Sequence, residues 1–317
     1  MNKGPEGLDS RPLDDSQKVK LGGRMAQQST RTLLDYVLLF TLTVIWGSSF
    51  ILYKEGLKGL DWNQVAILRI LIGSVCFVPM GYYWWKRTPK KALLAIFAVG
   101  LCGSGFPPFL FSLAQTKLES GLTGILNTLT PIFTLLIGIV LFGLAINKWK
   151  ATGLLIGLIG AAAIILVDPE KGLSGNALSG FYVILATACY AMSTNIVKAK
   201  LQDVHPIAIG VFAMLTISIP TLFLLPSADL VETWQTVEGA GRATFFASIL
   251  GIFCTAVANI LYFMLVQRTD VVFASTVTYM VPIVAIGWGL LDGESFIPMH
   301  FLGMGLILFG VWLTGRK

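Results

Sequence analysis

Arg69 is the only basic residue that lies well inside an apolar stretch of this sequence. An ionised group in such a place is costly unless it faces an aqueous cavity or a partner. Three acidic residues, Asp35, Asp270 and Glu294, lie at the ends of apolar stretches and not inside them. Because a guanidinium group presents a planar fork of N–H donors to carboxylates, we expect Arg69 to border a cavity and to attract an anionic group of a small-molecule substrate. The alternative is a structural arginine that bonds helix carbonyls or extends outward.

Aromatic and amide side chains in other apolar stretches could complete such a site. Trp46 and Tyr279 can supply flat stacking surface near the middle of a membrane, and Asn127 and Asn259 can hydrogen-bond a polar substrate. A membrane asparagine is also often a link between helices worth about 1 kcal/mol, so a structural role stays open for each of them. The candidate substrate-binding or pathway residues are Trp46, Ser49, Arg69, Asn127, Tyr190, Asn259 and Tyr279.

Two long apolar stretches, 119–143 and 270–293, carry a proline near the midpoint and end in Leu-x-Gly. In water a mid-helix proline costs roughly 3 kcal/mol, whereas in a membrane neighbouring helices, hydroxyls or water can satisfy the freed carbonyl. Broken helices duplicated in two halves are typical of transporter cores, although proline is also commoner in membrane helices than in soluble ones. We assign helix-break or gating roles to Pro107, Pro108, Pro131 and Pro282.

The composition predicts an integral membrane protein. Of the 317 residues, 55% are hydrophobic and 13% are charged, whereas a soluble domain carries about 25% charged residues. The four cysteines all fall inside apolar runs and the two histidines lie far apart, so no disulfide framework and no metal centre is indicated. We expect the lipid bilayer and a small molecule as partners, and neither a cofactor nor a nucleic acid.

Ten apolar runs approach the ~20 residues that a bilayer requires. Residues 1–32 are polar and predict a disordered tail. The runs group into two halves of five, 33–168 and 177–315, so the fold class is an all-α polytopic membrane protein. The predicted spans are 34–53, 63–85, 91–114, 119–143, 149–167, 178–197, 206–226, 243–265, 270–291 and 298–315.

The basic residues predict the orientation, because cytoplasmic loops carry an excess of Lys and Arg. The sequence has 23 Lys and Arg residues. One of them, Arg69, lies within a span, and 17 of the others lie on the side of the N-terminal tail. Both termini are therefore expected in the cytoplasm. The opposite side carries five: Lys54, Lys58, Lys117, Lys171 and Arg242.

The two halves repeat one another. The stretch from Trp46 to Lys54 matches that from Tyr190 to Lys198 at one constant offset. Five spans is an odd number, so the second half must be inverted relative to the first. Unusual residues accordingly fall in the outer halves of the first five spans and in the inner halves of the last five. Small-residue faces in spans five and ten predict close helix packing and leave a homodimer contact open; they consist of Gly153, Gly157, Gly160, Gly303, Gly305 and Gly310.

These residues resemble a known family. The Trp46-Gly-Ser-Ser-Phe50 motif, Arg69 and the two proline-centred spans resemble the EamA family of the drug/metabolite transporter superfamily, over about residues 34–315. The resemblance implies a ten-helix basket-like fold and export of amino acids, related metabolites or drugs across a bacterial inner membrane. In such repeats the fourth helix often ends in Gly-Glu. The second half keeps Gly293-Glu294, whereas the first half reads Gly143-Leu144, which puts in doubt a role that needs acidic residues at both ends.

The function expected from the sequence is secondary export of small metabolites by alternating access between two inverted repeats. A lipid or lipid-linked sugar flippase is an alternative, because the same fold would serve it. A membrane-embedded enzyme would need a nucleophile–base pair or paired acids inside the spans, and the sequence contains neither. The chain is therefore expected not to be an enzyme.

The orientation can be tested with single cysteines in a cysteine-free background. We expect an impermeant thiol reagent applied outside the cell to label a cysteine near Glu232 and to leave one near Lys90 unlabelled, because the charge bias places the loop 227–240 outside. Strong labelling near Lys90 with none near Glu232 would reverse the predicted orientation.

Overall fold

The computed structural model describes residues 32–144, 146–166, 172–268 and 271–314, and these residues form helices and connecting turns without a strand. The predicted tail lies outside the described residues except for Thr32. The helices of residues 32–166 are α2 (Leu33–Gly56), α3 (Trp62–Val75), α4 (Val78–Trp85), η1 (Lys90–Ala92), α5 (Leu93–Gly100), η2 (Leu101–Gly105), α6 (Phe106–Ala114), α7 (Ser120–Asn127), α8 (Thr130–Phe142) and α9 (Lys148–Leu166). Those of residues 172–314 are α10 (Gly172–Lys200), α11 (Pro206–Leu224), η3 (Pro226–Ala228), α12 (Leu230–Thr236), α13 (Ala240–Ile249), η4 (Leu250–Val257), α14 (Ala258–Arg268), α15 (Val271–Leu291) and α16 (Pro298–Thr314).

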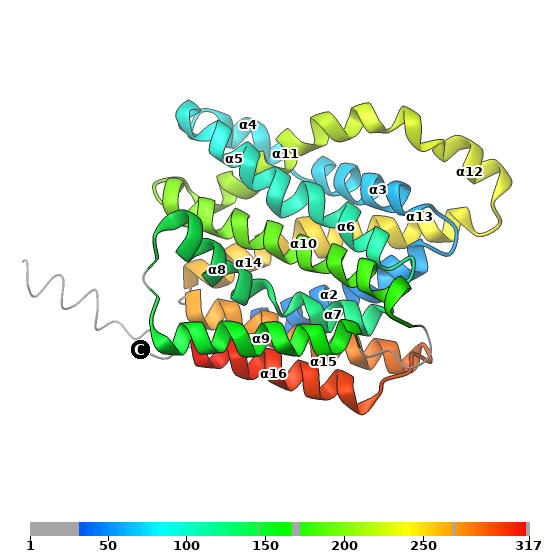
Figure 1. Ribbon diagram of the computed structural model, residues 1–317. Helices are drawn as coiled ribbons and strands as arrows, with labels where there is room; N and C mark the ends of the chain where they lie inside the picture. Colours follow the sequence, from blue (N-terminus) through cyan, green and yellow to red (C-terminus); the bar gives the residue numbers. More distant parts are fainter. Residues whose placement is uncertain (1–31, 145, 167–171, 269–270, 315–317) are drawn as a thin grey trace, which may run out of the picture.

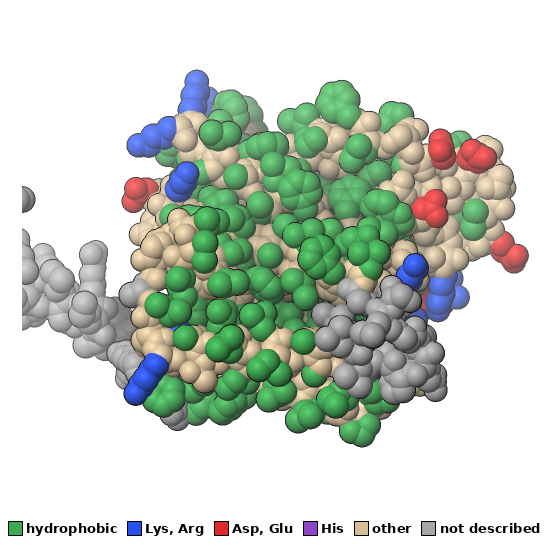
Figure 2. All heavy atoms as spheres, in the orientation of Figure 1, with side chains coloured by type: hydrophobic (Ala, Val, Ile, Leu, Met, Phe, Trp, Pro, Cys, Tyr) green, Lys and Arg blue, Asp and Glu red, His purple; other side chains and the backbone are tan. Residues whose placement is uncertain are grey.

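The apolar helices make this a polytopic membrane protein. Within the described residues, six helical stretches are long and apolar enough to cross a bilayer, and a bent pair formed by α3 and α4 raises the number to seven. Figure 2 shows hydrophobic side chains across the middle of one face, with charged side chains gathered at two opposite edges. Such a surface fits a hydrocarbon layer between two aqueous phases. The six stretches are Leu33–Gly56, Lys90–Gln115, Ser120–Phe142, Leu178–Lys200, Pro206–Leu224 and Ala240–Tyr262.

Helix α2 lies near the centre of the bundle and packs against α7 of its own half and against α13, α14 and α15 of the other half. Its buried residues, Leu42, Phe50 and Tyr53 among them, belong to the main hydrophobic core. The last helices of the two halves, α9 and α16, lie side by side (Figure 1).

Glycines set the spacing of α9 and α16. A Cβ on Gly153 would lie 2.4 Å from the carbonyl oxygen of Gly310, and a Cβ on Gly160 would lie 2.7 Å from that of Gly303. Close approach of two helix backbones through small residues is a common way of packing membrane helices, because dispersion contacts must replace the hydrophobic effect there. The two spans therefore meet through the predicted glycines Gly153, Gly160, Gly303 and Gly310, whereas Gly305 faces open space.

The prolines occupy different positions in the two halves. Pro131 lies in the first turn of α8, directly after the break that separates α8 from α7. Pro107 and Pro108 lie in the first turn of α6, which follows the π-helical turn η2. In contrast, α15 continues through Pro282. The expected break is absent there, because an interior proline can kink a helix without ending it, and α15 runs from Val271 to Leu291 without interruption.

Two glycines of α16 give a matched test of the packing. Gly310→Ala should lower the free energy of unfolding by about 1–3 kcal/mol, the usual range for overpacking, because its methyl group would meet the backbone of α9. Gly305→Ala on the same helix points into open space and should be neutral or stabilising. Thermal unfolding in detergent would measure both, and equal effects would contradict the packing.

Candidate functional site

Arg69 lies in the middle of α3 with only 8% of its surface exposed. Its Nε donates a hydrogen bond to Oγ1 of Thr255 at 3.0 Å, and its Nη1 donates to the hydroxyl of Tyr53. The guanidinium carbon also lies 5.0 Å from the centroid of the Tyr53 ring. All ion pairs of the described residues involve other basic side chains. The charge is thus surrounded by neutral hydroxyl groups and an aromatic ring.

A close backbone contact brings Thr255 to this arginine. Thr255 belongs to η4, a π-helical turn, and a Cβ on Gly251 in the same turn would lie 2.9 Å from the carbonyl oxygen of Arg69. A Cβ on Gly73 of α3 would in turn lie 2.8 Å from the carbonyl oxygen of Gly251. The two glycines therefore let η4 approach α3 at the turn that carries the arginine. Single π-helical turns are frequent at functional sites.

A cavity of about 20 Å³ adjoins the guanidinium group. It is large enough for about one water molecule, so the site is closed around Arg69 in this conformation. The Nη2 group of Arg69 makes no hydrogen bond to a described residue and is not fully enclosed. It is the donor that remains for a further partner. The cavity is lined by Arg69, Ile70, Gly103, Ser104, Pro108, Tyr190 and Thr255.

Three of the residues singled out in the sequence meet at this cavity, namely Arg69, Pro108 and Tyr190. Two others, Trp46 and Ser49, lie on α2 and do not line the cavity. The Nε1 of Trp46 donates to the carbonyl of Cys254 at 3.2 Å, and the hydroxyl of Ser49 donates to the carbonyl of Trp46 at 2.6 Å. Trp46 therefore links α2 to η4, the element that also carries Thr255.

The remaining predicted residues lie away from the cavity. Asn127 ends α7, and its Oδ1 is one of three buried side-chain atoms that lack a hydrogen-bond partner within the described part of the chain. The other two are the amide atoms of Gln115, which the sequence analysis did not select. Asn259 and Tyr279 are half-buried in α14 and α15. Neither of them lines the cavity.

Sequence reasoning missed the direct partners of Arg69. Tyr53 is almost fully buried, and its ring lies 6.4 Å from that of Phe111, which lies 6.0 Å from that of Tyr190. These aromatic rings form one wall near the arginine. The signal that could have found Tyr53 is its place beside Lys54 in the stretch that repeats in the second half. Thr255 carried no such signal, because it is an ordinary hydroxyl residue within an apolar run.

Comparison with known proteins gives the family. The model of the EamA-like transporter family matches residues 33–166 and again residues 178–316. An uncharacterized transporter of Archaeoglobus fulgidus is 27% identical over 283 residues, which are 89% of this chain and 98% of the relative. The uncharacterized inner membrane transporter YedA of Escherichia coli K12 is 24% identical, over 87% of this chain and 89% of the relative.

A third relative is named a probable amino-acid metabolite efflux pump of Salmonella typhimurium. It is 26% identical over 88% of this chain and 94% of its own length. A solved crystal structure with 16% identity shares the fold with a TM-score of 0.60, over 90% of this chain and 97% of the other. The chain belongs to the EamA-like transporter family, and it is a multi-pass membrane transporter and not an enzyme.

Proposed function

We propose that this transporter exports small metabolites that carry a carboxylate, such as amino acids or related compounds, and that Arg69 binds the carboxylate. One observation carries the proposal: a guanidinium group that is 8% exposed contacts neutral groups among the described residues and keeps Nη2 for a further partner. The name of the Salmonella typhimurium relative, an amino-acid metabolite efflux pump, supports this substrate class.

Electrostatics favour an anionic partner at this position. Two unit charges 4 Å apart attract each other by roughly 4 kcal/mol at an effective dielectric constant of 20. Tyr53 and Thr255 orient the arginine but supply no charge. A substrate carboxylate would therefore gain a charge-assisted hydrogen bond to Arg69. It would also gain the Coulomb attraction of the guanidinium charge, which the neutral partners Tyr53 and Thr255 do not compensate.

The size of the cavity supports a mechanism that requires movement. A space of about 20 Å³ is too small for an amino acid, so the substrate must enter after the helices around Arg69 separate. We propose alternating access between two inverted halves of five spans each, 33–168 and 177–315. The two separate matches of the family model support the division into halves. The break at Pro131 and the π-helical turn before Pro107 and Pro108 are the places where bending costs least, and Pro282 is proposed to act with them.

The other candidate residues are assigned secondary roles along the path. The unpaired buried Oδ1 of Asn127 can accept a hydrogen bond from a substrate amino group. Tyr190 lines the cavity, and Trp46 and Ser49 are proposed to face the substrate from α2 when the path opens, since Trp46 contacts η4, which carries Thr255. Asn259 and Tyr279 would contact the substrate only after the halves move. We further propose that the protein lies in a bacterial inner membrane, with both termini in the cytoplasm.

A comparison of two ligands tests the role of Arg69. Arg69→Gln should abolish transport of an amino acid and spare transport of its neutral amide or ester, while Arg69→Lys should retain part of the transport because the charge remains. A charge-assisted hydrogen bond is worth roughly 1.5–3 kcal/mol, or on the order of 10- to 100-fold in affinity. Uptake into liposomes measures both ligands. Equal losses for the two, or a fall in melting temperature that accounts for them, would remove Arg69 from the site.

The hydroxyl of Tyr53 offers a second test. Tyr53→Phe should lower the affinity for carboxylate substrates and reduce the free energy of unfolding by about 1–3 kcal/mol, because a buried guanidinium donor loses its acceptor. Tyr82→Phe is the matched control, because that side chain is 83% exposed. Identical unfolding temperatures and transport rates for both variants would show that Tyr53 does not position Arg69.

A further inference from the structure

The turn after α15 folds a glutamate back onto its own helix. Gly293 adopts a left-handed conformation with φ of 79°, and the amide of Glu294 donates to the carbonyl of Gly289 at 2.8 Å. A Cβ on Gly289 would lie 2.4 Å from Oε2 of Glu294, so this glycine makes room for the carboxylate. Glu294 is 7% exposed.

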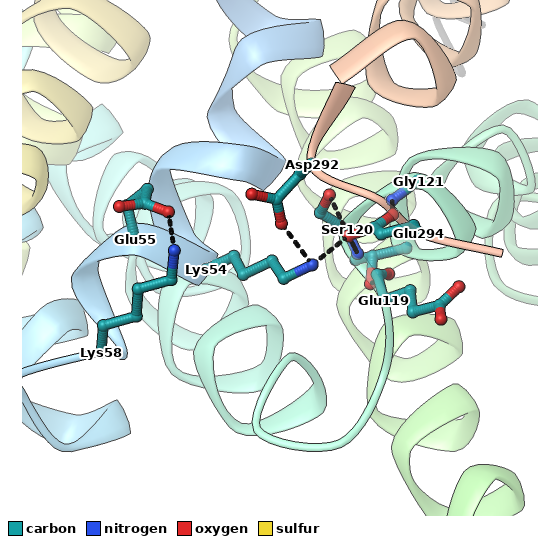
Figure 3. A network of polar contacts seen from close by, with 9 residues as sticks. Lys54, Glu55, Lys58, Glu119, Ser120, Gly121, Asp292 and Glu294 are labelled. Atoms are coloured by element: carbon teal, nitrogen blue, oxygen red, sulfur yellow. Dashed lines mark hydrogen bonds and ion pairs between the residues drawn. The ribbon is translucent and has the colours of Figure 1, made fainter. Parts of the chain in front are cut away.

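The buried carboxylate joins three helices (Figure 3). Its Oε1 accepts hydrogen bonds from Nζ of Lys54 at 2.8 Å, from the amide of Ser120 at 2.9 Å and from the hydroxyl of Ser120 at 2.7 Å. Its Oε2 accepts from the amide of Gly121 at 2.9 Å. Lys54 also pairs with Asp292 at 2.6 Å. Glu294 therefore ties the end of α2 and the start of α7 to the turn after α15.

Charge makes these contacts strong. Free backbone amides and the helix dipole favour an anion at the start of α7. Burial by itself raises the pKa of Glu294, but the hydrogen bonds from Lys54, Gly121 and Ser120 outweigh that effect and hold the pKa below its usual range. The carboxylate is charged at neutral pH, and removing it would leave the two amides without their acceptor and Lys54 with Asp292 as its remaining partner.

In the first half, α8 also ends in a left-handed glycine turn, but this turn lacks the acid and its hydrogen bond reaches back six residues and not five. Gly143 is left-handed with φ of 67°, and the amide of Leu144 donates to the carbonyl of Gly138 at 3.0 Å. The side chain of Leu144 lies over Gly138 as that of Glu294 lies over Gly289. Leu144 is 48% exposed and has no acceptor to offer to a neighbouring helix.

The two turns lie at opposite ends of the molecule. Gly153 lies against Gly310 and Gly160 lies against Gly303, so α9 and α16 are antiparallel. Since α9 begins at Lys148, just after Leu144, and α16 begins at Pro298, just after Glu294, the turns flank opposite ends of this helix pair (Figure 1). At the N-terminal end of α2, the buried carboxylate of Asp35 accepts from Nε of Arg268 at 2.8 Å and from the amide and hydroxyl of Thr32. Within the described part of the chain these contacts join α2 to α14 and to no third helix.

We propose that Lys54, Glu294 and the first turn of α7 form a latch that closes the transport path at one end, whereas the opposite end, where the turn carries Leu144, has only the smaller contact of Asp35 with Arg268. The proposal rests on alternating access as the transport mechanism. Opening at the latch end must separate α2 and α7 from the turn after α15, which breaks every contact of the carboxylate. Among the described residues, the polar contacts that must break at the Leu144 end are those of Arg268 with Asp35 and Thr32, and they join only α2 and α14. The smaller cluster there means that the resting transporter favours the conformation that is closed at Glu294.

A cysteine reporter tests the latch without any substrate. Ser104→Cys places a thiol at the cavity in a background where Cys76, Cys102, Cys189 and Cys254 are replaced by alanine. Membrane vesicles of both orientations are treated with an impermeant maleimide. In Glu294→Gln and in Lys54→Met, labelling from the face that carries Glu294 should rise about ten-fold or more. Glu294→Gln keeps the size of the side chain, which protects the fold.

The controls separate the latch from other causes. Glu232→Gln removes an exposed acid on α12 and should leave labelling unchanged, and Arg268→Gln should not raise labelling from the Glu294 face. An unchanged rate in both Glu294→Gln and Lys54→Met, or an equal rise in Glu232→Gln, would overturn the proposal. A rise of the same size from both faces would also overturn it, because general loosening admits the reagent from both sides. Failure of the two-ligand test on Arg69 would leave this result unaffected.

Discussion

The burial of one guanidinium charge is the constraint on which the centre of this protein depends. Taking an ion out of water costs several kcal/mol even after the surroundings relax. Hydrogen bonds to Tyr53 and Thr255 offset part of that cost. They can form because α2 and η4 both pack against α3 near Arg69. The absence of a side chain at Gly251 permits this close approach and so lets Thr255 reach Arg69.

Helix α2 connects this centre to the proposed latch. Neighbouring residues of its last turns, Tyr53 and Lys54, hold Arg69 and Glu294 respectively. A rotation or tilt of the end of α2 would therefore disturb both contacts together. This arrangement gives a physical route by which occupation of the site could change the stability of one end of the path. The route consists of a single packed helix with two polar contacts one residue apart.

The two halves keep the same backbone devices but differ in their side chains. Each half has a π-helical turn, η2 and η4, and each has a left-handed glycine that ends the helix before the last span. The side chains that follow those glycines are Leu144 and Glu294. The two ends of the molecule thus carry unequal contacts, because backbone geometry depends on glycine and helix pattern, whereas the contacts depend on single residues that can change independently.

The sequence alone determined the membrane class and the helical fold, because composition and apolar run length act locally and need no partner. The resemblance to the family came from the Trp46-Gly-Ser-Ser-Phe50 motif, Arg69 and the two proline-centred spans, and the family model confirmed it. It also determined that Arg69 and Tyr190 are unusual inside their spans, and that the glycines near the chain ends of the halves allow close packing. The tertiary structure decided which groups meet. Thr255 lies 186 residues from Arg69 in the chain and looks ordinary in its own stretch, so only packing reveals its role. In the sequence, Glu294 is only a residue at the end of a helix. The turn at Gly293 and the packing of α7 against it show that Glu294 is buried and binds both α2 and α7. The sequence gives the type of each side chain, whereas the partner of a buried charge depends on how helices that are far apart in the chain pack together.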